Sequence, residues 1–431
     1  MSIIVALLIL FSTICQASTF LVPPFEHTMG FNRITKFHLE LYLGSEFKLS
    51  DPQGITGAKM DEENDPKTSS DDRILTLFAV NSGTSQIIYN VKLSKIKIYG
   101  GLGKGKGEFN SPTGIVCNAQ GEVYIADTGN DRIVKLIYTK GSLHFDRIFA
   151  ESISAPKGVA MDAEGNLYVT DYKKSQIKVY DKQGKVISTW ISNLNNPTAI
   201  SIIDKSEIYN YYKDDFVIVI DNDNKRIQKF NRYGQLLAST NAYMLGLSNA
   251  EFNSCAIDYN ANIYVTDMMN NQVHKFDRSL NYITSIGGTG SGPLRFISPR
   301  GIFVNKRFGQ VFITDADGGY YYWLGVDGYI IGCYPQVMTE FHKGTTIALF
   351  LTELSQLKID IYDQTNNLVR TLIPEYFSEP GEVLIVWDGR NNNNQEVGPG
   401  EYDIRISIFP TYGLARRIFA KQLETKVKKS D

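Results

Sequence analysis

The stretch 111–136, SPTGIVCNAQGEVYIADTGNDRIVKL, contains three short apolar runs separated by turns. The runs cover residues 115–117, 123–126 and 133–136, and Gly, Pro, Asn and Asp are frequent between them. Runs of three or four residues are too short for an ordinary helix, and turn residues at this spacing are typical of antiparallel strands. The stretch therefore predicts three strands of one small sheet.

The same pattern recurs along the chain at intervals of 44 to 50 residues. Its most regular mark is a polar residue that ends the second run, found as Asn81, Asp127, Asp171, Asp221, Asp267 and Asp315. In the third unit a fourth run, 186–190, completes a set of four strands, which we name a to d. Four short strands in a period near 46 residues are typical of a propeller, in which each sheet buries its faces against its neighbours. The sequence predicts an all-β, six-bladed propeller.

The recurring aspartates have a structural interpretation. An Asp placed before a tight turn accepts hydrogen bonds from backbone N–H groups. A group that is repeated in nearly every blade is more simply explained by blade construction than by chemistry.

Residues 1–17 have the pattern of a secretory signal peptide. An apolar run, 3–11, precedes a more polar pair, and Cys15-Gln16-Ala17 predicts cleavage after Ala17. The run is shorter than the roughly 20 residues that span a bilayer. We expect a secreted or periplasmic protein with no membrane insertion in the mature chain.

Two further regions flank the repeats. Residues 34–43, ITKFHLELYL, alternate like a strand, and we expect them to close the ring against the sixth unit or to lie beside 329–333. The propeller is assigned to 18–335. Short apolar runs between turns continue over 339–431, which predicts a β-sandwich of the Ig type with Trp387 in its core.

The repeated region resembles the NHL repeat family. The resemblance rests on Pro112-Thr113-Gly114-Ile115, on 123–127, on Asn130-Asp131-Arg132-Ile133 and on their counterparts. Asn81 and Ala199 depart from the pattern, as does Phe252-Asn253-Ser254 in the fifth unit. The resemblance implies a six-bladed propeller.

The last region resembles the Ig-like domain of flagellar hook-capping proteins (FlgD-like). The residues that match are 361–363, 369–372, Trp387-Asp388-Gly389 and 397–402. This domain also ends many secreted bacterial proteins, so the resemblance implies a bacterial exported protein and not a flagellar role.

Two long loops between strands a and b fall on one face of the propeller. The first, 58–72, is acidic, and we interpret it as a solvated excursion. The second holds Tyr209, Tyr211 and Tyr212, which favours a contact surface because Tyr buries a large area at low entropic cost.

Candidate binding residues lie on the opposite face, on the loops between strands b and c and between blades. They are the cations Arg132, Lys157, Lys173, Lys174, Arg226 and Arg300. Some NHL propellers bind RNA on such a face. Here Asp131, Asp223 and Asp317 reduce the positive potential of this face. The whole chain has 44 basic and 46 acidic residues, which gives no general attraction for nucleic acid. We expect no nucleic-acid partner.

A metal site has little support in the sequence. None of the five His lies on a strand a, and a catalytic zinc needs three converging ligands, so the zinc lyases among such propellers are disfavoured. Asp162, Asp204 and Asp258 end their strands a and offer oxygen ligands for calcium, although we favour their interpretation as polar turn residues. We expect no cofactor.

The function predicted from the sequence is that of an exported bacterial binding or scaffold protein without catalysis. A propeller face would bind an extracellular or periplasmic protein or glycan. The alternative is a lyase or hydrolase with a divalent metal in the channel, and a third option is RNA binding. The sequence does not identify the ligand or the oligomeric state.

Overall fold

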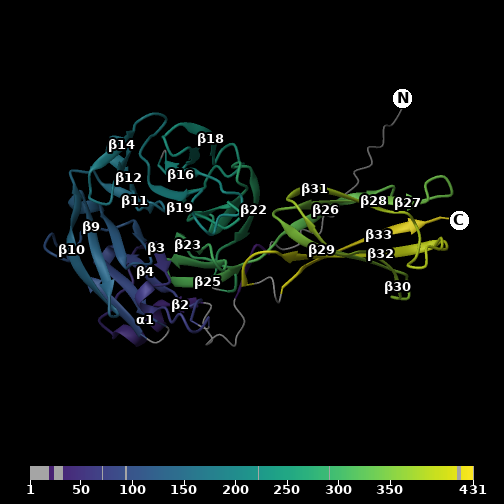
Figure 1. Ribbon diagram of the computed structural model, residues 1–431, viewed down its shortest axis with the longest axis horizontal. Helices are drawn as coiled ribbons and strands as arrows, with labels where there is room; N and C mark the ends of the chain where they lie inside the picture. Colours follow the sequence, from purple (N-terminus) through teal and green to yellow (C-terminus); the bar gives the residue numbers. More distant parts are fainter. Residues whose placement is uncertain are drawn as a thin grey trace, which may run out of the picture.

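The computed structural model describes residues 19–23, 33–69, 71–92, 95–221, 223–290, 292–414 and 419–430. Two β-rich lobes lie side by side, a ring of sheets and an elongated sandwich (Figure 1). The predicted signal peptide, 1–17, lies outside the described residues. In the described part of the chain, no helix is long and apolar enough to cross a membrane.

Five blades are four-stranded antiparallel sheets built from consecutive strands. Blade one holds β3 (Pro52–Ala58), β4 (Thr76–Asn81), β5 (Gln86–Val91) and β6 (Lys95–Gly100). Blade two holds β7 (Ile115–Cys117), β8 (Glu122–Asp127), β9 (Arg132–Thr139) and β10 (Ser142–Glu151). Blade three holds β11 (Pro156–Met161), β12 (Leu167–Asp171), β13 (Gln176–Tyr180) and β14 (Val186–Trp190).

Blade four holds β15 (Ala199–Ile203), β16 (Phe216–Asp221), β17 (Arg226–Phe230) and β18 (Leu236–Asn241). Blade five holds β19 (Phe252–Ile257), β20 (Ile263–Asp267), β21 (Gln272–Phe276) and β22 (Tyr282–Gly287). The first strand of each blade faces the centre of the ring (Figure 1). The predicted propeller is confirmed, and successive blades share apolar cores between their faces.

The N-terminal segment closes the ring in blade six. This blade has three strands of its own, β23 (Pro299–Asn305), β24 (Gln310–Asp315) and β25 (Gly318–Leu324). Its outer edge is filled by β1 (Leu21–Val22), paired with Trp323 and Leu324, and by β2 (Arg33–Thr35), paired with residues 318–320. Ring closure is therefore non-covalent and uses residues separated by about three hundred positions in the sequence.

The prediction of a strand over 34–43 is wrong beyond Thr35. Lys36–Leu43 forms helix α1, which lies next to β6. Thr35 caps it, because its Oγ accepts from the N–H of His38 while its own N–H donates to His38 Nδ1, and Gly44 ends it at φ +98°. Only Leu39 is buried along the helix, so the apolar alternation does not mark a buried sheet face.

The boundary between the two lobes also differs from the predicted one. We placed the end of the propeller at Pro335, but β26 (Gly328–Tyr334) pairs with β28 (Thr345–Leu351) in the sandwich. The propeller ends with β25 at Leu324. The error arose because an apolar run after β25 looked like the missing fourth strand, whose place is taken by β1 and β2.

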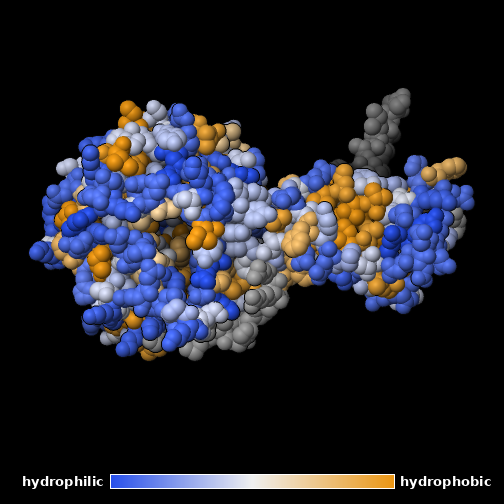
Figure 2. All heavy atoms as spheres, viewed as in Figure 1, coloured by the Kyte–Doolittle hydropathy of each residue, from blue (hydrophilic) through white to orange (hydrophobic). Residues whose placement is uncertain are grey.

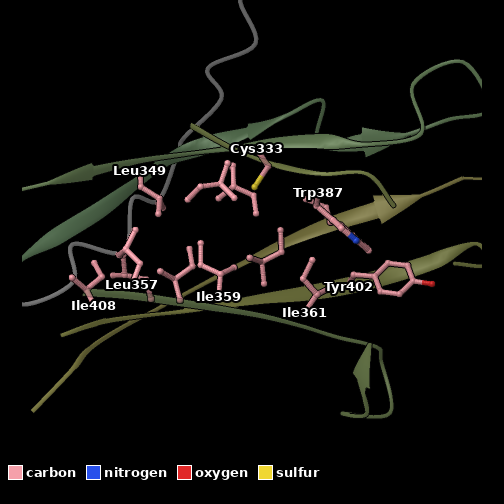
Figure 3. Packing of buried hydrophobic residues seen from close by; sticks show 14 of the residues in the cluster. Cys333, Leu349, Leu357, Ile359, Ile361, Trp387, Tyr402 and Ile408 are labelled. Atoms are coloured by element: carbon pink, nitrogen blue, oxygen red, sulfur yellow. The ribbon is translucent and has the colours of Figure 1, made fainter. Parts of the chain in front are cut away.

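The C-terminal lobe is a sandwich of two sheets. One sheet has the order β26–β28–β31 (Gly381–Trp387). The other has the order β27–β33–β32–β29–β30, made from β27 (Val337–Met338), β29 (Ser355–Tyr362), β30 (Leu368–Ser378), β32 (Gly400–Pro410) and β33 (Lys421–Lys429). Leu349, Leu357, Ile359 and Trp387 point between the sheets (Figure 3), and Trp387 is fully buried as predicted.

The two outer faces of the sandwich differ in chemistry. The larger sheet carries paired charges on its outer face, such as Lys358 with Asp360 and Lys426 with Glu401. The smaller sheet exposes Tyr329, Leu384 and Val386, and Figure 2 shows a broad apolar patch on this lobe.

The sandwich contacts the rim of blades four to six through their a–b and c–d loops. Tyr412 stacks on Tyr259 with ring centroids 4.8 Å apart, and its hydroxyl donates to the carbonyl of Lys306 at 2.5 Å. The tyrosine loop takes part as a contact surface within the chain, since Tyr212 donates to Glu379 at 3.2 Å. These contacts place the sandwich on the a–b side and leave the predicted binding face on the other side.

Candidate functional site: the mouth of the propeller channel

A channel of about 1080 Å³ runs between the six innermost strands. Its walls are the strands a of all six blades, together with loops from both faces of the propeller. A cavity of this size is large enough for a small ligand or one end of a polymer.

The recurring glycines allow neighbouring strands a to approach closely. A Cβ on Gly54 would lie 2.7 Å from the carbonyl oxygen of Thr113, and one on Gly301 would lie 2.5 Å from that of Gln53. On Gly114 a Cβ would overlap with the carbonyl oxygen of Lys157. The turn glycine is thus required by blade-to-blade packing, which explains its recurrence without any role in ligand binding.

The residue directly before each turn glycine, or before the Ala or Ser in its place, varies between blades and lines the channel. We call this set the mouth ring: Gln53, Thr113, Lys157, Thr198, Asn253 and Arg300. All six side chains are polar, two are cationic, and none is a carboxylate. The mouth ring opens on the face of the b–c and d–a loops, where the sequence placed the binding residues.

Lys157 is a partly desolvated cation. Its Nζ lies 3.7 Å from the centroid of the Tyr172 ring, and burial lowers the pKa of the ammonium. Asp223 is the nearby carboxylate, but its Oδ1 already accepts from the hydroxyl of Tyr172 at 2.9 Å and from Asn196 at 3.2 Å. Lys157 forms no ion pair with another described residue. An anion at the mouth would therefore meet a charge that is only weakly neutralised.

Arg300 is the second cation of the mouth ring, in blade six. Its Nη1 lies 3.6 Å from Oδ1 of Asp51, a loose pair in which the acid is about half exposed. Its Nε is buried, and within the described part of the chain it has no hydrogen-bond partner. Asn224 also lines the channel, and its Oδ1 is a buried acceptor that likewise lacks a partner among the described residues. Among the described residues, the site thus has one buried donor and one buried acceptor without a hydrogen-bond partner.

The six predicted binding residues fall into three groups. Lys157 and Arg300 belong to the mouth ring, and Lys173 and Lys174 are exposed on the neighbouring turn Tyr172–Lys174. The guanidinium groups of Arg132 and Arg226 instead serve blade construction. Arg132 donates to Asp127 at 2.7 Å and to backbone carbonyls, and Arg226 donates to Asp221 at 2.7 Å.

The structural interpretation of the blade aspartates agrees with their contacts. All five are buried, and four of the carboxylates accept from the backbone before strand a, as in Asn110 N–H to Asp127 at 2.7 Å and Ile297 N–H to Asp315 at 2.8 Å. Asp171 instead accepts from the side chain of Gln176 at 2.8 Å. In blade one Asn81 also accepts from the backbone, from the N–H of Ser50 at 2.8 Å. An amide oxygen satisfies this acceptor role, which explains why Asn replaces Asp there.

Carboxylates at the opposite, a–b mouth are all engaged. Asp61 accepts from Gln120 at 3.0 Å, Asp72 from Arg307 at 2.7 Å, and Glu207 from Lys306 at 2.6 Å. The acidic loop before β4 is packed and not simply solvated as we expected. Its Met60 is buried, and its Glu63 accepts from the hydroxyl of Tyr138 at 2.7 Å.

The three aspartates considered as calcium ligands are similarly committed. Arg232 bridges Asp162 and Asp204 at 2.5 Å each, and Asp258 accepts from Tyr264 at 2.9 Å. Among the residues that the structure describes, no group of three His, Cys, Asp or Glu is arranged to hold a metal ion. These three described aspartates are therefore not free to hold a channel-bound divalent cation.

The two thiols in the channel wall are poor nucleophiles. Cys117 and Cys255 line the wall, and burial raises the pKa of both thiols to about 12. In the described part of the chain the lining contains no histidine, and His274 instead lies 3.1 Å from Asp267 inside blade five.

Three family models match separate parts of the chain. Residues 51–209 match the SMP-30/gluconolactonase/LRE-like region, 254–322 match a 6-bladed beta-propeller family, and 338–408 match the FlgD Ig-like domain. The protein is a six-bladed β-propeller followed by a FlgD-type Ig-like domain. Both resemblances inferred from the sequence are thereby confirmed.

Solved structures similar to this propeller protein share little sequence with it. Virginiamycin B lyase from Staphylococcus aureus is 12% identical, with a TM-score of 0.42 over 58% of this chain and 76% of the lyase. A streptogramin B lyase is 16% identical, with a TM-score of 0.44 over 65% of this chain and 95% of that chain. PorZ of Porphyromonas gingivalis, a bacterial surface component of the type-IX secretion system, is 11% identical, with a TM-score of 0.46 over 92% of this chain and 54% of PorZ. No curated protein sequence matches the chain.

Proposed function

We propose that this propeller protein is an exported bacterial binding protein that acts without catalysis. The face around the mouth ring would bind a protein or glycan partner outside the cytoplasm. The observation that carries this proposal is the mouth ring itself. The six equivalent positions hold five residue types, all polar, and they surround an open channel.

The arrangement of the two lobes supports this face. The Ig-like domain contacts the propeller through Tyr412, Glu353 and Glu379, which meet the a–b loops and strand β21. The mouth ring lies at the other end of the channel. A bound partner would therefore meet the propeller without displacing the Ig-like domain, which is placed to act as a spacer or attachment module.

The state of the acids and thiols that line the channel supports binding without turnover. General acid–base catalysis needs a group whose pKa lies near the working pH and whose proton can reach the substrate. The acidic residues that line the channel, Asp61, Asp72, Asp162 and Glu207, all accept hydrogen bonds from neighbours, and the two lining thiols have pKa values near 12.

Charge reversal on one blade tests the face. The double variant Lys173→Glu/Lys174→Glu alters the b–c turn beside the mouth ring, and Lys182→Glu/Lys185→Glu alters the c–d turn of the same blade on the opposite face. The full-length protein is applied to glycan and peptide arrays. Binding that the first variant loses and the second retains supports the proposal. The proposed binding face is contradicted if no probe on the arrays binds or if both variants lose binding equally. The non-catalytic assignment is contradicted if mass spectrometry shows turnover of a bound probe.

A further inference from the structure

We infer that the mouth ring is a binding site for an acidic glycan, a chain of sugars that carries carboxylates and free hydroxyls. Lys157 and Arg300 would bind the carboxylates, and the neutral members of the ring, with Asn224, would bind the hydroxyls. The inference rests on the proposed function, because it names the ligand class of the same face.

The positions of the two cations favour a ligand with more than one negative charge. They belong to blades three and six, which occupy opposite sides of a six-bladed ring, and both line the channel. Nε of Arg300 is buried without a hydrogen-bond partner in the described part of the chain, and Lys157 is desolvated against Tyr172. Charge-assisted hydrogen bonds to such groups are stronger than neutral ones, since water competes less.

The unpaired side-chain oxygen of Asn224 argues against an anion without hydrogen-bond donors, such as sulfate, as the preferred ligand. Oδ1 of Asn224 is buried in the channel wall without a partner among the described residues. Sulfate or a fully ionised phosphate has only acceptor oxygens, so it would leave this carbonyl unpaired at a cost. A sugar acid offers carboxylate acceptors for the cations and hydroxyl donors for Asn224.

The two threonines of the ring add further acceptors. The hydroxyl of Thr113 donates to the carbonyl of Lys157 at 2.9 Å, and that of Thr198 donates to the carbonyl of Ile220 at 3.2 Å. The oxygen of Thr113 also lies 2.8 Å from the hydroxyl of Thr128, so part of its acceptor capacity is used inside the blade. Thr198 lines the channel with its single proton used in this way, and its oxygen can accept from a sugar hydroxyl.

The same composition disfavours an acidic peptide. Protein interfaces concentrate their binding energy in buried aromatic or aliphatic anchors. The mouth ring contains neither, because its members are Gln, Thr, Lys, Thr, Asn and Arg. A polar ligand that needs many hydrogen bonds is the better match to this opening.

The test measures the affinity of the full-length protein by titration calorimetry with four probes. These are galacturonate oligomers, neutral galactose oligomers of the same length, hexaglutamate and dextran sulfate. We expect galacturonate oligomers to bind most tightly. Lys157→Met and Arg300→Gln should each weaken that binding by about tenfold or more, as expected for loss of a charge-assisted hydrogen bond. Asn224→Leu should weaken binding of galacturonate while leaving hexaglutamate binding unchanged.

Lys182→Glu/Lys185→Glu is the matched control and should bind galacturonate like the wild type. Thermal unfolding of each variant shows whether the fold persists. The inference is overturned if dextran sulfate or hexaglutamate binds more tightly, if galacturonate does not bind, or if Arg300→Gln binds it unchanged. Should the array experiment still find a partner that depends on Lys173 and Lys174, only the ligand class is wrong. Should no ligand depend on this face, the proposed function fails as well.

Discussion

The ammonium of Lys275 in blade five lies 2.6 Å from Oε1 of Glu353 in the Ig-like domain, and both side chains are buried. Asn260 donates to the second oxygen of Glu353 at 3.4 Å, and the rings of Tyr264 and Phe20 lie within 6 Å of the ammonium. The N-terminal segment, two segments of blade five and the Ig-like domain therefore meet at one ion pair. The pair fixes how the two domains are joined.

Removing one partner of this pair should strongly destabilise the protein. In Glu353→Ala the buried ammonium of Lys275 loses its ion-pair partner and keeps only its weaker interaction with the carboxylate of Asp258, and breaking a buried pair typically costs about 3–5 kcal/mol. The double variant Lys275→Met/Glu353→Leu removes both charges and should recover most of that loss. Urea unfolding of the three proteins measures the effect. If the double variant is as unstable as Glu353→Ala, lost packing and not the lone charge is responsible.

Ring closure should depend on Gly318. This residue has φ +148°, and a Cβ there would overlap with the carbonyl oxygen of Ile34 in β2. Gly318→Ala should therefore strain or release β2 at a cost of about 1–3 kcal/mol. Gly319→Ala is the control, since its Cβ would make ordinary contacts at 3.4 Å and beyond. Equal unfolding temperatures for the two variants would show that β2 contributes nothing to closure.

Asp127 should be a stability residue with little effect on binding. Its carboxylate accepts from Asn110 N–H, from Asn130 and from Arg132, all within 2.9 Å, and it is fully buried. Asp127→Ala removes the counter-charge of Arg132 and should cost about 3 kcal/mol or more, and Asp127→Asn should cost less because it keeps an acceptor. Chemical denaturation of both, beside the exposed Asp146→Asn, provides the comparison. An unchanged midpoint for Asp127→Ala would contradict the structural role.

The repeated parts of this protein could be predicted from the sequence because six copies of one unit can be compared with each other. A turn glycine seen once, at Gly114, has many explanations, but its recurrence at Gly158 and Gly301 indicates blade packing. The same reasoning directed attention to Lys157 and Arg300, the varying neighbours of those glycines. Both line the channel in the structure.

Features that occur once were harder to predict. Residues 34–43 alternate in polarity, yet Thr35 and Gly44 are a helix cap and a helix stop, and these local hydrogen bonds decided the outcome. Arg132 and Arg226 looked like free surface cations because the sequence does not show that each faces the aspartate five residues before it. Asn224 was missed altogether, since an unpaired buried oxygen is a property of the assembled channel.

The Ig-like domain should show a pH dependence that originates at Asp363. In the turn after β29 its carboxylate accepts from the N–H of Asn367 and from the N–H and hydroxyl of Thr365 at 2.8–2.9 Å. These hydrogen bonds, led by that of Asn367, lower the pKa of Asp363 to about 2, below its unfolded value near 3.8. A carboxyl whose pKa is lower in the folded state stabilises the fold above its unfolded pKa and loses that contribution as the pH falls to the folded one. The stability difference between wild type and Asp363→Asn should therefore shrink between pH 4 and pH 2. Unfolding curves of both proteins across this range measure it, and a difference that stays constant with pH would show that Asp363 titrates normally.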